Sequence, residues 1–437
     1  MKVLVVGTGA REHALVRGLL RDPQVDAVHA APGNAGIAAQ APTHPVDAND
    51  GAAVAALAVD LAVDLVVIGP EAPLVAGVAD AVRAAGITCF GPSAAAARLE
   101  GSKAFAKQVM AEAGVPTARA HACTTPEQVA AALAEFGPPY VVKDDGLAAG
   151  KGVVVTSDRA AALAHAQACG PVVVEEYLDG PEVSLFVVCD GAGDGSAAVP
   201  LLPAQDFKRI GDGDRGPNTG GMGAYTPLPW APADLVEQVM TAVVRPTLAR
   251  MADRGTPFSG LLYVGLALTG AGVRVVEFNA RFGDPETEVV LELLDTPLAG
   301  LLHAAATGSL AGRAPLQWRD GAAVTVVLAS ENYPASPVVG DPIGGLADAG
   351  ACPQVAVLHA GTATDGDGRV CTCGGRVLAV TATGIDLSDA RANAYRAVER
   401  IDLRGGQYRH DIAAAAAAGL VTGVAPSSPR QAETIRP

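Results

Sequence analysis

The sequence predicts an α/β domain at the N-terminus, an α+β region after it and a small mixed α/β domain at the C-terminus. In residues 1–100, strand-like apolar runs at 2–6, 25–31, 64–69 and 87–91 alternate with helical stretches that include 12–21 and 74–85. Elements that alternate at this spacing form a parallel sheet with helices on both faces. Such sheets bind ligands at the carboxyl ends of their strands. Four turns rich in Gly or Pro, at 7–13, 31–36, 69–74 and 91–93, lie at those ends.

Composition limits the possible functions. The chain has 437 residues and a net charge of −15, which disfavours a general surface for nucleic acid or anionic membranes. Apolar runs end before the length of a membrane span, and the first residues resemble a β-strand rather than a signal peptide. The seven cysteines are scattered, and Cys371 and Cys373 read as alternating residues of one strand. Reduced thiols and a cytoplasmic location are the expectation.

The rest of the chain predicts several further elements. Residues 102–113 and 158–168 read as helices, and 140–143, 152–156, 172–178 and 182–188 read as strands. Residues 205–229 form a long Gly/Pro/Asp-rich stretch, for which a functional role is the expectation. A helix over 232–253 then leads into a hairpin of two strands. The last section predicts strands from 321, at 355–361 and at 374–384, a helix over 386–401 and a disordered tail over 425–437.

The first turn, "GTGAREH" at 7–13, suggests a dinucleotide fingerprint. That pattern needs a third small residue, and Glu12 stands in its place. A glutamate there would crowd the helix against the strand and place an anion near a pyrophosphate. A single phosphate at the helix N-terminus, with Arg11 nearby, fits better. An ordinary strand-to-helix turn is the plainer alternative.

The stretch "KDDGLAAGKG" at 143–152 ends in Gly-Lys but is not a Walker A motif. Three residues rather than four separate Gly146 from Gly150, and Gly152 stands where Ser or Thr should hold Mg²⁺. The strand-like "GVVVT" follows where a helix is required. The segment therefore predicts a Gly-rich hairpin loop that covers phosphates with backbone N–H groups and Lys151. A flexible hairpin with a solvated lysine is the alternative.

The segment "VVEFNARFGDPE" at 275–286 predicts a metal site. Glu277 and Asn279 are two residues apart on a strand and share a face, and their oxygens are hard ligands suited to Mg²⁺. Arg281 follows on that face and can hold a carboxylate. An exposed polar strand end is the alternative. Upstream, "VVVEEYLDGPEVSLF" at 172–186 places backbone groups where an adenine edge could bind, with Glu182 near the ribose.

The order of these features resembles that of the ATP-grasp ligases, and among them the phosphoribosylamine–glycine ligase family. Matching segments include "REHAL", "APGNAG", "VIGPEAPLVAGV", "LEGSKAF", "DGLAAGKGV", "GPNTGGMGAY", "EFNARFGDPET" and "GGRVLAVTA". They extend to about residue 412. The resemblance implies a substrate-binding domain at 1–101, an ATP-grasp domain at 102–320 with a mobile lid at about 115–185, and a C-terminal domain at 321–424. It also implies that ATP, glycine and 5-phosphoribosylamine give glycinamide ribonucleotide, ADP and phosphate through a glycyl phosphate.

The resemblance further implies a role for each site residue. ATP is expected on Lys103, Lys143, Gly146, Gly150, Lys151, Gly152, Glu175, Glu176, Leu178 and Glu182, and Mg²⁺ or Mn²⁺ on Glu277 and Asn279. The substrates are expected on Gly9, Arg11, Asn34, Gly69, Glu71, Asp206, Lys208, Arg209, Asn218, Gly220, Gly221 and Arg281. Lys143, Lys151 and Arg281 are the expected catalytic residues, with Arg281 on the glycine carboxylate. A monomer with transient transfer to neighbouring purine enzymes is the expected assembly.

Three departures and two alternatives accompany this reading. The family usually shows Ala where Asp144 stands, the stretch between 156 and 172 looks short, and the strand before Glu277 carries no acid. Strand alternation predicts that Asp144 faces away from the nucleotide. One alternative is an ATP-grasp ligase with another acceptor, against which the first-domain turns argue. The other is a non-catalytic nucleotide-binding or regulatory protein, against which Lys103, Lys143, Glu277 and Asn279 argue.

Overall fold

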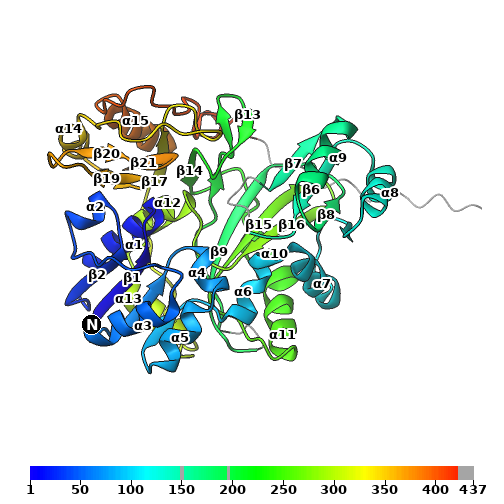
Figure 1. The fold of residues 1–437 in the computed structure, drawn as a ribbon, viewed down its shortest axis with the longest axis horizontal. Coiled ribbons are helices and arrows are strands. Elements are labelled where there is room, and N and C mark those ends of the chain that lie inside the picture. The colour runs from blue at the N-terminus through cyan, green and yellow to red at the C-terminus, as the bar shows by residue number, and fades with distance from the viewer. Residues whose placement is uncertain (148–151, 194–196, 422–437) are drawn as a thin grey trace, which may run out of the picture.

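The computed structural model describes residues 1–147, 152–193 and 197–421. Figure 1 shows the N-terminal and C-terminal parts side by side at one end of the molecule. A small sheet with two helices lies at the other end, beyond the central strands. Within the described ranges, no helix is long and apolar enough to cross a membrane. All seven cysteines fall in these ranges, and all are free thiols.

The first sheet is parallel throughout and has the strand order β2-β1-β3-β4. Its strands are β1 (Lys2–Gly7), β2 (Ala27–Pro32), β3 (Leu65–Ile68) and β4 (Thr88–Phe90). The main helices are α1 (Ala10–Leu20), α3 (Gly51–Asp60) and α5 (Val78–Ala84), and α2 (Ala35–Ala38) is a single turn. The predicted parallel α/β sheet is confirmed.

One predicted helix of this region is wrong in its bounds. The stretch 74–85 forms two helices, α4 (Glu71–Val75) and α5, rather than one. Gly77 separates them with a φ of 84°, a left-handed conformation that interrupts helical hydrogen bonding. The helix α4 therefore begins directly after the third turn, where it carries Glu71.

The small sheet at the end of the molecule, here called the peripheral sheet, is antiparallel. Its order is β5-β8-β6-β7, with β5 (Ala120–Cys123), β6 (Tyr140–Asp144), β7 (Val153–Thr156) and β8 (Val172–Glu175). The helices α8 (Pro126–Phe136) and α9 (Arg159–Ala168) cover it, and a separate small apolar cluster forms its core. The strand predicted over 172–178 ends at Glu175, so the residues after it form an extended connection.

The central sheet has the order β10-β9-β15-β16 and supplies the strand with the predicted metal ligands. Its strands are β9 (Glu182–Asp190), β10 (Val199–Pro200), β15 (Ser259–Thr269) and β16 (Gly272–Asn279). Helices α6 (Ala94–Gly101) and α7 (Lys103–Ala113) connect the first sheet to the peripheral sheet, and α12 (Glu286–Leu293) and α13 (Leu298–Ala306) follow β16. The predicted helix 232–253 is divided into α10 (Leu235–Val239), a π-helical turn (Met240–Val244) and α11 (Arg245–Asp253).

The Gly/Pro/Asp-rich stretch at 205–229 is not a bare loop. It contains β11 (Gln205–Asp206), β12 (Arg209–Gly211), β13 (Arg215–Asn218) and β14 (Gly223–Thr226). Strand β14 joins the C-terminal sheet, whose order is β11-β14-β17-β21-β18, with β17 (Ala322–Ala329), β18 (Val355–His359) and β21 (Arg376–Gly384). The region also carries α14 (Leu346–Gly350), β19 (Thr362–Thr364), β20 (Val370–Thr372), α15 (Leu387–Val398) and α16 (Ala414–Ala417).

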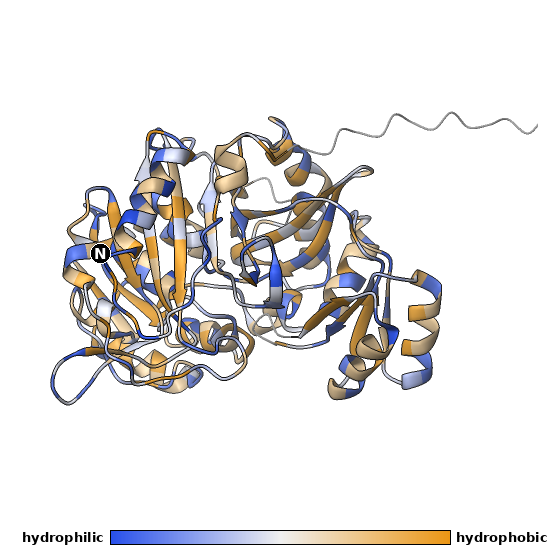
Figure 2. Ribbon diagram, turned by 90° about the horizontal axis from the view of Figure 1, so that it is seen from above, coloured by the Kyte–Doolittle hydropathy of each residue, from blue (hydrophilic) through white to orange (hydrophobic). Residues whose placement is uncertain are grey.

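Apolar side chains are concentrated in the sheets, whose strands are largely orange in Figure 2. Two large buried clusters run through the molecule, and each includes residues of the first, central and C-terminal sheets. Those three sheets therefore share cores, whereas the core of the peripheral sheet is separate.

Candidate functional site

The end of β16 places a carboxylate, an amide and a guanidinium close together. Glu277 is half-buried, and within the described part of the chain its carboxylate has no hydrogen-bond or ion-pair partner. Burial acts to raise the pKa of Glu277, but Lys208, Lys143 and Lys103 together lower it below its ordinary value. Asn279 is buried next to it, with its Oδ1 3.4 Å from a guanidinium nitrogen of Arg281. An ionised, unpartnered carboxylate beside an amide oxygen suits a hard divalent cation.

A buried chain of charges supports the lysine of β6. The Nζ of Lys143 lies 2.8 Å from Glu175 Oε2 and donates to the carbonyl of Val276 at 2.9 Å. Lys107 on α7 reaches the other carboxylate oxygen of Glu175 at 3.0 Å. Burial lowers the pKa of Lys107, whereas Glu175 and Glu277 raise the pKa of Lys143 despite its burial. Lys143 is therefore held as a cation directly beside the β16 backbone.

Lys107 was missed from the sequence, although a signal was present. It lies four residues after Lys103 on a predicted helix, so both lysines share one helix face. Lys103 itself donates to the carbonyl of Gly146 at 2.9 Å. Asp145 accepts the backbone N–H of Ala104 at 2.9 Å, at the start of the same helix. The helix α7 and the loop after β6 are thereby joined at the base of the predicted lid.

The predicted lid loop is described only at its two ends. Gly146 and Gly152 lie in the structure, and the carbonyl of Gly152 accepts the backbone N–H of Asp144 at 2.7 Å. Gly150 and Lys151 lie outside the described residues. Asp144 follows Lys143 on β6, so the two side chains point to opposite faces of the peripheral sheet.

The predicted adenine and ribose residues have protein partners in this structure. Glu176 accepts the Nε–H of Arg119 at 2.8 Å and its backbone N–H at 3.0 Å, while Leu178 lies half-buried on the extended connection after β8. The carboxylate of Glu182, at the start of β9, pairs with Lys208 at 2.5 Å. The sequence placed Glu182 and Lys208 in different subsites, and the structure brings them together.

Lys208 lies among carboxylates that the sequence did not group. Its Nζ is 3.8 Å from Asp206, and Asp206 and Glu182 raise the pKa of Lys208 well above its ordinary value despite burial. Burial and the neighbouring acids raise the pKa of Asp206 to about 7. Glu286 is nearby and accepts hydrogen bonds from Tyr263 at 2.9 Å and Ser184 at 3.1 Å.

Arg209 and Asn218 face one another in the short β12–β13 hairpin. Arg209 donates to the carbonyl of Gly216 at 2.8 Å, so its guanidinium stabilises that hairpin. Gly220 and Gly221 follow at the far end of the loop, where Gly220 donates to the hydroxyl of Tyr333 at 3.0 Å.

Glycines at two turns of the first sheet make room for a buried glutamate. Glu12 is 1% exposed and accepts the N–H of Gly9 at 2.6 Å. A Cβ on Gly69 would lie 2.0 Å from Glu12 Oε1, and one on Gly7 would lie 2.6 Å from Glu12 Cγ. The expected crowding by Glu12 is therefore relieved by the glycines rather than by displacement of the helix.

Two arginines connect the first sheet to the end of β16. Arg11 pairs with Glu12 at 2.5 Å and donates to the carbonyl of Phe282 at 3.1 Å. Arg281 pairs with Glu71 at 3.2 Å and with Glu100 at 3.0 Å. Burial acts to lower the pKa of Arg281, but Glu100 and Glu71 raise it above its ordinary value. In this structure the guanidinium predicted for glycine is thus held by protein carboxylates, of which Glu100 was not predicted.

The side chain of Asn34 makes hydrogen bonds to backbone groups of three residues. It caps α2 by accepting the N–H of Ile37 at 2.9 Å, and it donates to the carbonyls of Thr8 and His359, each at 2.8 Å. Its amide therefore fixes the second turn against the first turn and against β18.

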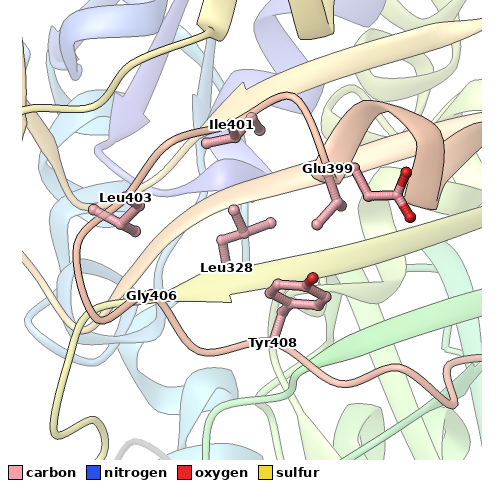
Figure 3. Close-up of a pocket in the computed structure, with 7 residues that line it drawn as sticks. Leu328, Glu399, Ile401, Leu403, Gly406 and Tyr408 are labelled. Atoms are coloured by element: carbon pink, nitrogen blue, oxygen red, sulfur yellow. The ribbon is translucent and has the colours of Figure 1, made fainter.

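The cavity in Figure 3 is separate from these residues. It has a volume of about 260 Å³ and lies in the C-terminal region, lined by Leu328, Val398, Glu399, Ile401, Leu403, Gly406 and Tyr408. The predicted site residues that the structure describes are not among its lining residues. Among the described residues, no cluster of three or more His, Cys, Asp or Glu side chains could hold a metal ion.

The residues at the end of β16, the buried lysine of β6 and the peripheral and central sheets fit an enzyme of the ATP-grasp class. Three models of phosphoribosylglycinamide synthetase match the chain in order: the N domain over residues 1–100, the ATP-grasp (A) domain over residues 101–287 and the C domain over residues 323–415. The chain belongs to the phosphoribosylamine–glycine ligase family.

Similar proteins agree over nearly the whole length. The phosphoribosylamine–glycine ligase of Streptomyces coelicolor is 68% identical over 419 residues, covering 95% of this chain and 100% of the relative. That of Mycobacterium leprae is 59% identical over 430 residues, covering 96% and 100%. The crystal structure of the enzyme from Thermotoga maritima has a TM-score of 0.80 at 34% identity, covering 94% and 100%.

A more distant structure shares the fold. The biotin carboxylase domain of the Hydrogenobacter thermophilus 2-oxoglutarate carboxylase, solved with MgADP and bicarbonate, has a TM-score of 0.69. Its identity is 18%, and the match covers 93% of this chain and 91% of that chain. At this identity the likeness concerns the fold alone.

Proposed function

We propose that this protein ligates glycine to 5-phosphoribosylamine at the expense of ATP, giving glycinamide ribonucleotide, ADP and phosphate in purine biosynthesis. A glycine carboxylate oxygen attacks the γ-phosphorus and ADP leaves. The amine of phosphoribosylamine then attacks the carbonyl carbon of glycyl phosphate, and phosphate leaves. One observation carries the proposal: the Glu277 carboxylate has no protein partner among the described residues, and three lysines lower its pKa. This carboxylate lies in a chain that belongs to the ligase family.

The metal belongs beside Glu277 and Asn279. The structure supports a site for Mg²⁺ or Mn²⁺ there, since a free carboxylate oxygen and an amide oxygen lie on one strand end. When bound, the cation neutralises the charge that develops on transferred phosphate oxygens. The protein residues position the other groups around it.

ATP phosphates would lie against Lys143 and Lys103, under the loop that carries Gly146, Gly150, Lys151 and Gly152. The cation of Lys143 is supported by Glu175, so we assign Glu175 a role through that lysine rather than through adenine. The backbone at Glu176 and Leu178 would meet the adenine edge. Glu182 would bind the ribose, and its ion pair with Lys208 would break when the nucleotide binds.

The acceptor would occupy the space between the first sheet and the 205–229 segment. We assign to it Gly9, Arg11, Asn34, Gly69, Glu71, Asp206, Lys208, Arg209, Asn218, Gly220 and Gly221, and we assign the glycine carboxylate to Arg281. Of these, Arg11 and Asn34 act through backbone contacts that shape the turns. Arg281 would exchange one of its two carboxylate partners for glycine.

We also propose domain bounds and an assembly state for this protein. We place the domains at 1–101, 102–320 and 321–424, with the lid at about 115–185. We propose a cytoplasmic monomer that passes its product to neighbouring purine enzymes by transient contact.

The test is ADP release with freshly generated phosphoribosylamine, with glycine, Mg²⁺ or phosphoribosylamine omitted in turn. Release should require all three. Release that continues without glycine excludes the ligase activity. Release that needs glycine but not phosphoribosylamine, and rises with another amine, identifies a ligase with a different acceptor.

A further inference from the structure

Arg376, at the start of β21, reaches from the C-terminal region into the predicted acceptor site. Its NH1 donates to the carbonyls of Gly220 at 2.5 Å, Asp284 at 2.8 Å and Gly221 at 3.3 Å. Its NH2 pairs with the Asp284 carboxylate at 3.1 Å. The side chain is 20% exposed, so its head is largely enclosed by these partners. One guanidinium thus connects two segments that lie far apart in the sequence.

Both segments belong to the acceptor side. Gly220 and Gly221 form the end of the loop before β14, and Asp284 lies five residues after the end of β16. Asp284 also lies beside the first turn, since a Cβ on Gly9 would be 3.3 Å from its Oδ2. The guanidinium therefore lies where the loop, the strand end and the first turn meet.

The loop has little rigidity of its own. Gly221 adopts a φ of 112°, and consecutive glycines lose more backbone entropy on ordering than other residues do. The C-terminal region restrains Gly220 on both sides: the hydroxyl of Tyr333 accepts its N–H, and Arg376 binds its carbonyl. A lysine could replace these contacts only in part, because its single ammonium lacks the planar fork that spans separated acceptors.

We propose that Arg376 is a positioning residue of the acceptor site, which holds the Gly220–Gly221 loop and Asp284 in the geometry that binds the amine substrate. It acts through these backbone groups. The nucleotide side of the cleft does not depend on it, since Lys143, Glu175 and Lys107 are held by other contacts. The inference rests on the proposed function for the identity of the acceptor.

The experiment compares Arg376→Met and Arg376→Lys with the wild type. Arg404→Met is the matched control, since Arg404 pairs with Glu331 and Asp341 inside the C-terminal region. In Arg376→Met we expect the apparent KM for phosphoribosylamine to rise at least about tenfold and kcat/KM for it to fall about 100-fold, with the KM for ATP within about twofold. Arg376→Lys should recover part of the loss, and Arg404→Met should match the wild type.

Hydrogen exchange gives a readout that does not depend on the substrate. The amides of residues 219–223 should exchange faster in Arg376→Met, while those of the peripheral sheet should not change. Tyr333→Phe, which removes one hydrogen bond, should produce the same pattern to a smaller degree if Arg376→Met does not fold. Unchanged exchange and an unchanged phosphoribosylamine KM in a folded variant would overturn the inference, as would equal rises in both KM values. Failure of the wild type in the omission assay would instead reject the proposed function, and exchange would still test the loop contact.

Discussion

The peripheral sheet and the acceptor side of the cleft are built in opposite ways. The peripheral sheet has its own apolar core, and polar contacts connect it and the residues before β5 to the central sheet. Among them are Lys143 to the carbonyl of Val276 and Thr117 to the carbonyl of Val275. The acceptor side instead joins three sheets that share two large cores. Buried and partly buried hydrogen bonds, such as those of Arg11, Asn34 and Arg376, connect these sheets.

This difference suggests a division of work. A unit with its own core can move as a body when its few external contacts change, which suits a cover that opens for ATP. A site shared by several sheets cannot move without disturbing a core, which suits the fixed orientation of two small substrates. Changes on the two sides should therefore affect different substrates.

Glu277→Gln should remove turnover while the fold persists. The variant keeps the size of the side chain but loses the charge that three lysines stabilise. We expect kcat to fall by about 10³-fold or more, because charge stabilisation at the transferred group is lost. Steady-state kinetics at saturating Mg²⁺ and circular dichroism measure the two properties. Glu237→Gln, at an exposed position of α10, is the control, and near-wild-type kcat in Glu277→Gln would show that the metal is placed wrongly.

Lys107→Met should weaken ATP binding without affecting the acceptor. The change leaves Glu175, which is buried, with Lys143 as its remaining cation and allows that pair to shift. We expect the apparent KM for ATP to rise about tenfold, the order of magnitude of one charged contact. Lys107→Arg should recover much of the loss. A rise confined to the phosphoribosylamine KM would contradict the assignment.

Acid should destabilise the contact between α1 and β18. His13 accepts the backbone N–H of His359 at 2.8 Å, and burial lowers the pKa of His13 to about 3 and that of His359 to about 4. Unfolded histidines bind protons below pH 6.5, so the unfolded state binds more protons between that pH and the folded pKa values. Stability is complete above pH 6.5 and falls on acidification, by about 1.4 kcal/mol per pH unit for each histidine.

Denaturant unfolding at pH 7.0, 5.5 and 4.5 measures this slope. His13→Gln should reduce it by about 1.4 kcal/mol per pH unit, because the glutamine does not titrate while His359 still does. His121→Gln at an exposed position should leave the slope unchanged. Equal slopes in wild type and His13→Gln would rule out the proposed cause.

Asp144→Ala should have the smallest effect. The side chain faces away from Lys143 across β6, on the side of Cys169, whose pKa burial and Asp144 both raise. We expect the KM for ATP to stay within about twofold, since a charge on the far face of a strand is screened from the nucleotide. A clear fall in that KM would show that Asp144 repels the phosphates.

Sequence reasoning predicted what depends on local patterns. Apolar runs at regular spacing predicted the parallel sheet, and strand alternation placed Glu277 and Asn279 on one face. The same reasoning did not find Arg376 or Glu100. Arg376 meets Asp284 across 92 positions of sequence, and Glu100 meets Ala280 across 180, so no local period marks either contact.

Some errors came from local conformations that tertiary contacts decide. No strand was predicted within 205–229 because Gly, Pro and Asp dominate it, yet β14 pairs with β17, which lies about 100 residues later. Glu12 looked too large for its turn, because the space provided by Gly69 comes from a different strand. The roles of the site residues stay predictions: Glu182 and Arg281 pair with protein groups in this structure, whereas Glu277 has no partner among the described residues.

The most direct test of the two-sided account is a crossed measurement of apparent KM. ATP and phosphoribosylamine are titrated separately in the wild type, Lys107→Met and Arg376→Met under one set of conditions. We expect Lys107→Met to raise only the KM for ATP and Arg376→Met to raise only the KM for phosphoribosylamine. If both variants raise the same KM, or if each variant raises both KM values equally, then the peripheral sheet and the acceptor side do not serve different substrates.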